Sequence, residues 1–182
     1  MKKLMIISSL ILITSFSFAS LRGTQTWLKK QGINYSLTKL KSLTKLDLQD
    51  SSVSDISPLK ELKKLQVLYL MRTEVSDITV LKGLKNLRIL NLFGTQVSDI
   101  TALKGLKNLK ELYLESTQVT NITALKGLKN LKELYLGATE VSDVTALKGL
   151  KNLKHLDLEQ TQVSKKAIRA LKKALPNCEI SH

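Results

Sequence analysis

The sequence contains few of the residues on which most enzyme active sites and metal centres depend. In 182 residues there are one cysteine, Cys178, and two histidines, His155 and His182. A single cysteine excludes an internal disulfide framework and a zinc site made from several cysteines. The sequence also shows no pairing of a nucleophile with a base and no glycine-rich phosphate loop. It therefore predicts neither an enzyme nor a bound cofactor.

Aromatic residues and acidic side chains are also scarce. Phe, Trp and Tyr make up 4% of the chain, and 29 basic side chains outnumber 15 acidic ones, which gives a net charge of +14. Such a balance raises nucleic acid or an anionic surface as a partner. Because no aromatic residues alternate with the lysines to stack on bases, nucleic acid is not expected as a partner.

Long apolar runs are limited to the N-terminus. Two lysines precede the apolar segment Leu4–Phe16, and Ser17 and Ala19 supply the small residues of a cleavage site. The run of about 13 residues is shorter than the ~20 residues of a membrane-spanning helix. Residues 1–19 are therefore predicted to be a signal peptide that is cleaved after Ala19. Its removal would leave an exported protein, periplasmic or secreted, without a transmembrane segment.

The rest of the chain repeats itself every 22 residues. Residues 95–116 read TQVSDITALKGLKNLKELYLES, and residues 117–138 differ from them at only four positions. Leucines mark the same step along most of the chain, at positions 46, 68, 90, 112, 134 and 156. A period of this length is typical of a solenoid, in which each unit buries its apolar face against its neighbours.

Each repeat predicts a short strand and a compact return segment. In the motif Leu112-Tyr113-Leu114 apolar residues alternate, as they do in a strand with one buried face. The segment ALKGLKNL before it has a leucine at every third position, which favours a tight helical or irregular return. The repeats are expected to fill residues 37–163, between an N-terminal cap at 20–36 and a C-terminal cap at 164–182.

Both caps are expected to contain a helix. The N-terminal helix would be capped by Thr24 or Thr26 and would end at Gly32. Near the other end, residues 164–175 have the spacing of an amphipathic helix, and a last strand can follow it. Cys178 is interpreted as a buried residue of this cap, because free cysteine is among the most buried residue types.

The repeat resembles the leucine-rich repeat. The pattern L-x-x-L-x-L-x-x-N-x-L is matched by LKELYLESTQV at residues 109–119 and at five other places. The 22-residue unit with V-S-D-I is similar to the internalin-like bacterial subclass. The resemblance implies an α/β solenoid, an arc with a short parallel concave sheet, an irregular or 3-10 helical convex side and helical caps. It also implies a non-enzymatic protein that interacts with a host surface or with the cell envelope.

One column departs from the family pattern. The usual asparagine is replaced by serine at position 51 and by threonine at positions 73, 95, 117, 139 and 161. In the family this asparagine bonds backbone groups between turns. The resemblance therefore implies that the threonine hydroxyl performs the same task while the methyl group is buried.

The repeats disagree mainly at four positions around the Leu-x-Leu motif. Strand side chains alternate, so three of these positions point outward together on the concave sheet, the surface with which solenoids bind. The lysines of LKGLKNL should be equally exposed and do not vary, which favours recognition over random drift. The fourth position, directly after these three, holds Arg72, Gly94, Ser116, Ala138 and Gln160.

The outward positions have the chemistry of a protein interface. Tyrosine is enriched in interfaces because it combines a large apolar body with a polar tip. The N-terminal half of the face is apolar and the C-terminal half is acidic, so the predicted partner is a protein or peptide with an apolar anchor and a nearby Lys or Arg. The predicted binding residues are Val67, Tyr69, Met71, Ile89, Asn91, Phe93, Glu111, Tyr113, Glu115, Glu133, Tyr135 and Asp157.

Two further interpretations concern the lysines and the internal histidine. Lysine columns at 60, 82, 104, 126 and 148 and at 63, 85, 107, 129 and 151 would form convex ridges. These ridges are either solvated or bind a polyanion, such as an acidic polysaccharide or an anionic membrane surface. His155, Asp157 and Glu159, with Glu133 beside them, have ligand types that suit a divalent ion. Such groups are more often solvated surface, and no metal site is predicted.

Overall fold

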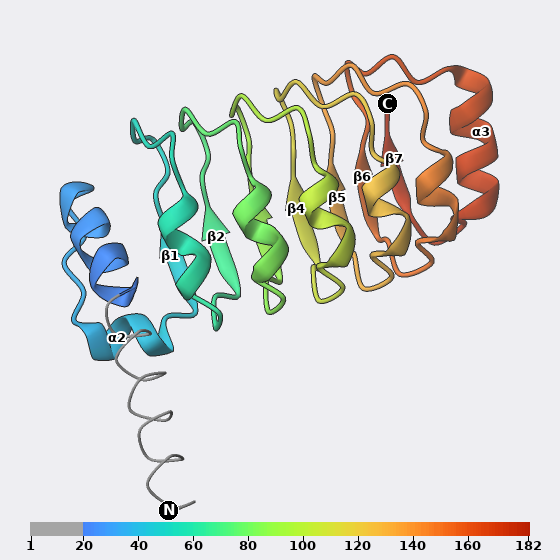
Figure 1. Ribbon diagram of the computed structural model, residues 1–182. Helices are drawn as coiled ribbons and strands as arrows, with labels where there is room; N and C mark the ends of the chain where they lie inside the picture. Colours follow the sequence, from blue (N-terminus) through green and yellow to red (C-terminus); the bar gives the residue numbers. More distant parts are fainter. Residues whose placement is uncertain (1–19) are drawn as a thin grey trace, which may run out of the picture.

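The computed structural model describes residues 20–182, so the predicted signal peptide lies outside the described residues. The elements follow one another along a solenoid (Figure 1). After a helix at 20–30, the helices and strands are α2 (Leu37–Ser42), β1 (Lys45–Asp47), β2 (Val67–Tyr69), β3 (Ile89–Asn91), β4 (Glu111–Tyr113), β5 (Glu133–Tyr135), β6 (His155–Asp157), α3 (Lys165–Ala174) and β7 (Glu179–Ser181). From β1 to β6, consecutive strands are joined through the 3-10 helices η1 (Ser57–Glu61), η2 (Thr79–Gly83), η3 (Thr101–Gly105), η4 (Thr123–Gly127) and η5 (Thr145–Gly149).

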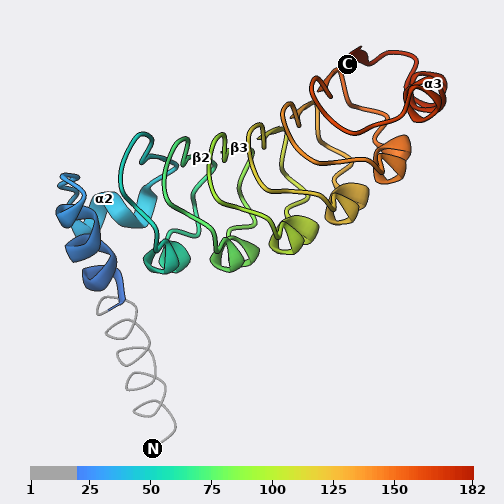
Figure 2. The same cartoon turned by 90° about the horizontal axis from the view of Figure 1, so that it is seen from above.

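The strands form one parallel sheet in chain order, from β1 to β7. Leu46 pairs with Leu68, and Leu68 pairs with Leu90. Each step up to β6 advances the pairing by one repeat, so equivalent residues of successive repeats lie side by side. Figure 2 shows the resulting arc, with the strands on its inner side and the 3-10 helices along its outer side. The predicted leucine-rich-repeat arc, with its parallel sheet and 3-10 helical convex side, is confirmed.

The leucines of each coil fill one continuous core. In the coil that contains β4, Leu103, Leu106, Leu109, Leu112 and Leu114 all have an exposed fraction of 0%. Burial of one such side chain stabilises the folded state by about 1.5–3 kcal/mol. A single coil is too thin to enclose these leucines, so they become buried only when coils stack on one another.

The N-terminal helix differs in one respect from the expectation. It already runs from residue 20, so Thr24 lies inside it and neither Thr24 nor Thr26 is its cap. The Thr24 hydroxyl instead donates to the carbonyl of Pro58 at 2.8 Å, which ties the helix to the first 3-10 helix. Gly32 ends the helix as predicted: its φ is +76°, and the Ile33 amide donates to the Leu28 carbonyl at 2.9 Å.

The C-terminal end is closed by α3 and β7. The Ser164 hydroxyl caps α3 by accepting a hydrogen bond from the Ala167 amide at 3.2 Å. Ile168 and Leu171 are the buried residues of this helix. The last strand, β7, pairs in parallel with β6 and places Ile180 beside Leu156. Within residues 20–182, no helix combines the length and the apolar composition that a membrane crossing requires.

The threonine column bonds within its own coil and not between coils, which corrects the expectation. The hydroxyl of Thr95 donates to the Leu92 carbonyl at 2.7 Å, and that of Thr117 donates to the Leu114 carbonyl at 2.6 Å. The same bond forms at every repeat from Ser51 to Thr161. A threonine side chain is too short to reach the next coil, so it closes the turn that follows its own strand.

Bonds between coils come instead from the asparagines of LKGLKNL. The side-chain amide of Asn108 donates to the Lys85 carbonyl of the preceding coil at 2.9 Å, and Asn130 donates to the Lys107 carbonyl at 2.8 Å. Asn86 and Asn152 repeat the arrangement. This column forms a ladder of hydrogen bonds along the solenoid, which the sequence comparison did not reveal.

One lysine column also contacts the next coil. The ammonium group of Lys129 donates to the Gly149 carbonyl at 2.8 Å, and that of Lys85 lies 3.5 Å from the Gly105 carbonyl. A Cβ at Gly149 would lie only 2.7 Å from the Lys129 Nζ. Lysine, glycine and asparagine in LKGLKNL therefore have structural contacts. The asparagines and part of this lysine column are held by structural contacts, whereas the outer lysine column at 60, 82, 104, 126 and 148 is exposed, so the constancy of the segment has a structural cause at some of its positions.

Aspartate side chains lie just before most of the 3-10 helices and bond the first amide of each such helix. Asp77 Oδ1 accepts a hydrogen bond from the Thr79 amide at 2.8 Å, and Asp143 Oδ1 accepts one from the Thr145 amide at 2.8 Å. Hydrogen bonds from the side chain and the amide of Thr79 lower the pKa of Asp77 below its usual value. These carboxylates offset the lysines and also fix the start of each return segment.

The fourth variable column has a backbone explanation. Arg72, Ser116, Ala138 and Gln160 have φ between 53° and 56°, and Gly94 has φ of 64°. This left-handed conformation is costly for residues with a Cβ and is natural for glycine. The glycine at position 94 is therefore explained by the backbone conformation that this column requires. The variation in the column is not evidence of binding.

We predict that Ala138→Gly stabilises the protein, because glycine relieves the left-handed strain at this position. The free energy of unfolding, measured in urea, should rise by roughly 0.5 kcal/mol or somewhat more. The reverse change at the equivalent position, Gly94→Ala, should lower it by about 1 kcal/mol. A loss of stability in Ala138→Gly would contradict the assignment.

We also predict that Asn108→Ala destabilises the protein by about 1 kcal/mol, because the Lys85 carbonyl loses its donor from the neighbouring coil. Urea unfolding measures the change. Gln118→Ala, at an exposed loop position, serves as the control and should change the free energy of unfolding by less than about 0.5 kcal/mol. Equal effects of the two substitutions would show that the asparagine ladder contributes nothing specific.

Candidate functional site on the concave sheet

The structure places all twelve predicted binding residues on the concave side of the arc. In each central strand the middle leucine is buried, and the residues on either side of it are partly exposed. The in-register pairing sets equivalent residues into rows across the sheet, for example Tyr69, Asn91, Tyr113, Tyr135 and Asp157. The placement follows from the alternation in the strands, while a binding role for these residues stays a prediction.

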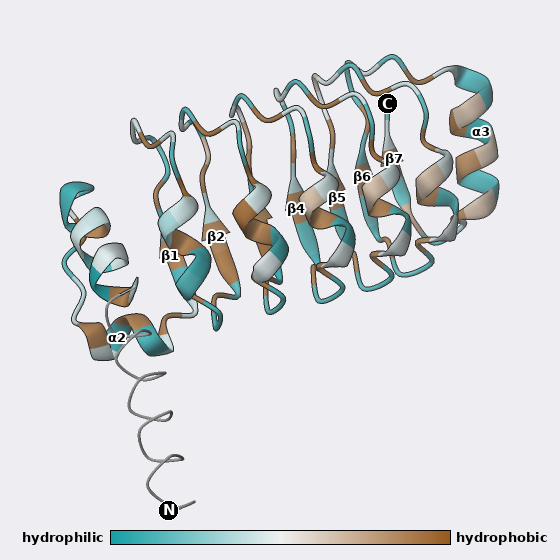
Figure 3. Cartoon of the chain, in the orientation of Figure 1, coloured by the Kyte–Doolittle hydropathy of each residue, from teal (hydrophilic) through white to brown (hydrophobic). Residues whose placement is uncertain are grey.

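The N-terminal half of the face is apolar and is edged by two cations. Val67 pairs with Ile89, and Figure 3 shows the brown, hydrophobic colour of β2. The Lys45 Nζ lies 5.0 Å from the centre of the Tyr69 ring, and the Arg72 Cζ lies 5.7 Å from the centre of the Phe93 ring. Cations at these distances are attracted to the faces of aromatic rings. The sequence comparison did not predict these contacts.

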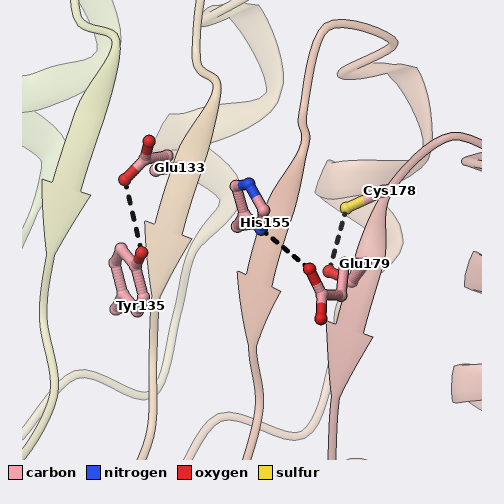
Figure 4. Close-up of polar contacts among 5 residues, drawn as sticks. All are labelled: Glu133, Tyr135, His155, Cys178 and Glu179. Atoms are coloured by element: carbon pink, nitrogen blue, oxygen red, sulfur yellow. Dashed lines mark hydrogen bonds and ion pairs between the residues drawn. The ribbon is translucent and has the colours of Figure 1, made fainter.

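Two tyrosines form a flat stack at the middle of the sheet. The ring centres of Tyr113 and Tyr135 are 4.7 Å apart, and the ring planes differ by 4°. The phenol of Tyr113 donates to Glu111 at 3.4 Å, and that of Tyr135 donates to Glu133 at 3.3 Å (Figure 4). Burial, reinforced by the nearby carboxylates, raises the pKa of both phenols. Both phenols therefore stay protonated at neutral pH and can donate hydrogen bonds.

The C-terminal half of the face contains an unusual carboxylate. Glu115 is half-buried, and its Oε2 atom is buried without a hydrogen-bond partner. Burial is the main cause that raises the pKa of Glu115, and the charge of Asp157 adds to the effect. A buried oxygen without a donor lowers the stability of the folded state, so such atoms are rare in folded proteins.

Asp157 and Asn91 are partly engaged with the backbone. Asn91 Oδ1 accepts a hydrogen bond from the Phe93 amide at 2.9 Å, and Asp157 Oδ1 accepts one from the Glu159 amide at 2.8 Å. The tyrosines in the same row make no such bond to the residue two positions on. Part of the difference between repeats in this row is therefore local, because Asn and Asp fix the end of their own strand.

The group around His155 does not converge on one point. His155 Nδ1 lies 3.1 Å from the Glu179 carboxylate on β7, whereas Glu133 bonds Tyr135 (Figure 4). Among residues 20–182, no three or more His, Cys, Asp or Glu side chains gather closely enough to hold a metal ion. Cys178 is only partly buried, and this burial raises the pKa of its thiol to about 11. The thiol is therefore protonated at neutral pH, when it is a poor nucleophile.

Comparisons with known proteins agree with this architecture. The family model described as Leucine Rich repeats (2 copies) matches residues 41–83 and 85–128. Among solved structures, internalin C2 from Listeria monocytogenes is similar, with a TM-score of 0.72 and 36% sequence identity over 78% of this chain and 61% of that one. Internalin F from the same organism gives a TM-score of 0.71 and 26% identity over 88% of this chain and 54% of that one.

A leucine-rich-repeat protein from Leptospira interrogans is also similar. Its TM-score is 0.66, with 24% identity over 79% of this chain and 44% of that one, so this likeness shows the fold alone. No curated protein matches the sequence. The chain spans less than two thirds of each of these solved structures. The resemblance to internalin-like leucine-rich repeats, predicted from the repeat motif, is confirmed.

We predict that Glu115→Gln stabilises the protein at pH 7. The folded state raises the pKa of Glu115 above its ordinary value of 4.5, so its stabilising contribution is complete below that value and is lost as the pH rises through the folded pKa. Urea unfolding should show a gain from the substitution at pH 7 that shrinks at pH 4. Glu159→Gln removes the same charge at an exposed position and is the control. A loss of stability in Glu115→Gln at both pH values would contradict the prediction.

Proposed function

Because this chain is an internalin-like leucine-rich-repeat protein, we propose that it is an exported module without enzymatic activity that binds a protein or peptide on its concave sheet. The observation that carries the proposal is the row of partly exposed aromatic side chains, with Tyr69, Tyr113 and Tyr135 on one face and Phe93 beside them. Large rings that are only half covered gain stability when a partner excludes the remaining water.

The apolar half of the face would supply the anchor. Val67 and Ile89 lie on the neighbouring strands β2 and β3, Met71 and Phe93 follow these strands, and all four side chains are partly exposed. A contiguous apolar patch of this kind on a soluble protein usually marks an interaction site. Lys45 and Arg72, held over the rings at its edge, are suited to form a polar rim around an apolar contact.

The acidic half would supply selectivity. Glu111, Glu115, Glu133 and Asp157 concentrate negative charge on one side of a chain whose net charge is +14. This contrast favours a partner with basic side chains at the contact, while the overall charge disfavours partners that are basic throughout. Charges of this kind contribute more to selectivity and to the association rate than to affinity.

The size of the sheet limits the partner. Seven strands at a spacing of ~4.8 Å make a surface about 29 Å wide. With three outward residues in each repeat, this area falls short of the ~800 Å² that each partner buries in a standard interface. The partner is therefore a short segment or loop, or a larger protein that also touches the flanking loops.

A polyanion-binding envelope protein is the second candidate. The lysines at 82, 104 and 126 line open clefts beside the 3-10 helices. The neighbouring column is less suited to the role, because Lys85, Lys129 and Lys151 donate to backbone carbonyls. The outer column, at 60, 82, 104, 126 and 148, is exposed and is therefore the more available of the two for an acidic polysaccharide or an anionic membrane.

Pull-down with two variants separates the candidates. The first is Tyr69→Ala with Phe93→Ala, and the second replaces the five lysines of the outer column by glutamine. The partner is captured from bacterial envelope extract or from eukaryotic cell surfaces. We predict that the affinity of the aromatic variant for this partner falls about 30-fold or more, because truncation at an interface hot spot costs about 2 kcal/mol. The lysine variant should retain the partner.

Binding to phosphatidylglycerol vesicles is measured in parallel as a direct test of the polyanion candidate. The lysine column chosen for substitution makes no backbone capping bond of the kind made by Lys129, so the variant should fold. If the lysine variant loses all binding while the aromatic variant keeps it, the concave-face proposal is wrong and polyanion binding replaces it. Circular dichroism checks that both variants are folded.

A further inference from the structure

An open cleft lies between two neighbouring 3-10 helices on the convex side of the arc. The helices are η2 and η3, which follow one another along the outer side (Figure 2). The cleft has a volume of about 440 Å³, and ligand pockets usually measure about 300–1,000 Å³. Its charged lining residues are Lys82, Lys85 and Lys104, and two threonines, Ala102 and Gly105 complete the lining. We name it the lysine cleft.

The charges of the lysine cleft distinguish it from other clefts on this side. The cleft that adjoins it at the start of the same helices is lined by two aspartates, Asp77 and Asp99. The next two clefts along the solenoid each combine one lysine with one aspartate. Of these four clefts within residues 20–182, the lysine cleft alone has no carboxylate in its lining. Its ammonium groups repel one another, so an anion placed between them is stabilised by all three.

The two nearby aspartates are held by the backbone. Asp77 Oδ1 accepts a hydrogen bond from the Thr79 amide at 2.8 Å, and Asp99 Oδ1 accepts one from the Thr101 amide at 2.8 Å. These bonds keep both carboxylates at the start of their helices. The first lysine of each helix follows three residues after the threonine, which is about 6 Å at a rise of ~2.0 Å for each residue. An anion at the lysine end therefore meets ammonium groups first.

The neighbouring coil holds the Lys85 ammonium group in the cleft. Its Nζ lies 3.5 Å from the Gly105 carbonyl, and a Cβ at Gly105 would lie only 2.6 Å from it. The ammonium group thus occupies space that a side chain at position 105 would fill. An ammonium group has three donors, and the long bond to Gly105 uses one, so two remain for a ligand. At the equivalent Gly127, a Cβ would meet no atom within 4 Å.

We propose that the lysine cleft binds an acidic sugar unit of an anionic polysaccharide, as a second site separate from the concave sheet. The ammonium groups of Lys82, Lys85 and Lys104 surround the sulfate or carboxylate group of that unit. This site does not depend on the protein-binding function, and it gives a polyanion a defined position on the convex side.

A polysaccharide fits the lysine cleft better than a membrane or a free ion does. The convex side is curved (Figure 2), whereas a bilayer is flat on this scale, so few coils can touch it at once. A single oxyanion fills only a small part of about 440 Å³, while a sugar unit with its charged group has a suitable size. A chain that crosses the helices also meets an exposed lysine on each coil, at positions 60, 82, 104, 126 and 148.

Binding of a fluorescein-labelled heparin hexasaccharide, followed by fluorescence anisotropy, tests the proposal. The salt concentration is about 0.15 M, at which exposed charges more than ~8 Å apart are largely screened. The triple variant Lys82→Gln/Lys85→Gln/Lys104→Gln should bind about 30-fold more weakly than the wild type, because it loses the charged donors of the cleft. Circular dichroism checks that the variant is folded. No binding of the hexasaccharide to the wild type would overturn the proposal.

A control variant separates the cleft from the net charge. It is Lys165→Gln/Lys166→Gln/Lys172→Gln, which removes the same three charges from exposed positions on α3. We expect it to weaken binding less than about threefold, because these charges are screened from the cleft. Equal losses in the two triple variants would show that only net charge attracts the hexasaccharide, and the proposal would be wrong.

Two glycine substitutions test the cleft without changing any charge. In Gly105→Ala the added methyl group meets the Lys85 ammonium group and displaces it, whereas in Gly127→Ala it meets nothing within 4 Å. Binding of the hexasaccharide should weaken roughly fivefold in Gly105→Ala, because one charged donor leaves its position. It should change less than about twofold in Gly127→Ala. Equal affinities of the two variants would contradict the site.

Further measurements distinguish the source of the anion and the face that binds it. If phosphatidylglycerol vesicles bind through the cleft lysines and the hexasaccharide does not, the occupant is a membrane and the proposal is wrong. Competition by inorganic sulfate at an equal sulfate concentration would likewise show that a free ion suffices. Tyr69→Ala/Phe93→Ala should bind the hexasaccharide as the wild type does. Loss of binding in that variant would move the site to the concave sheet and overturn the proposal, whereas the protein-binding function is decided by its own pull-down.

Discussion

The in-register stacking of one coil on the next is the constraint on which the rest of the structure depends. No coil encloses its own leucines, so the coils must stack, and the parallel sheet then brings equivalent residues of successive repeats together. A repeated side chain consequently meets its own copy. The tyrosine stack of Tyr113 and Tyr135 arises in this way, and so does the pairing of Glu111 with Glu133, where the phenols donate to both carboxylates.

The repeat made the backbone of this structure predictable. A leucine pattern that returns every 22 residues sets the strands, the return segments and the residues that share a face. All twelve candidate residues therefore lie on the concave side, because alternation in a strand leaves only two possible faces. The period shows that positions are equivalent, but it does not show what they contact. Asn108 and Thr95 look alike as short polar residues, yet one reaches the preceding coil and the other closes its own turn.

The parts of the candidate site that were not predictable depend on distances between coils. The lysine and the arginine over aromatic rings and the lysine that reaches Gly149 involve residues about one repeat apart, whose separation is set by the coil geometry. The unpartnered oxygen of Glu115 likewise depends on how the coils bury it. These contacts also change the interpretation of the sequence. The asparagines and one lysine column of LKGLKNL are held by contacts with the neighbouring coil, so the case for recognition rests on the half-buried rings and on the separation of apolar and acidic halves across the concave sheet.

Site-specific cross-linking tests the central claim, that the concave sheet is the binding surface, most directly. The photo-reactive amino acid p-benzoylphenylalanine replaces Tyr113 on the concave sheet in one version of the protein and Lys126 on the convex side in another. Both are illuminated in the same envelope and cell-surface extracts. The account predicts a discrete cross-linked partner from position 113 and none from position 126. A partner captured from position 126 alone would contradict it.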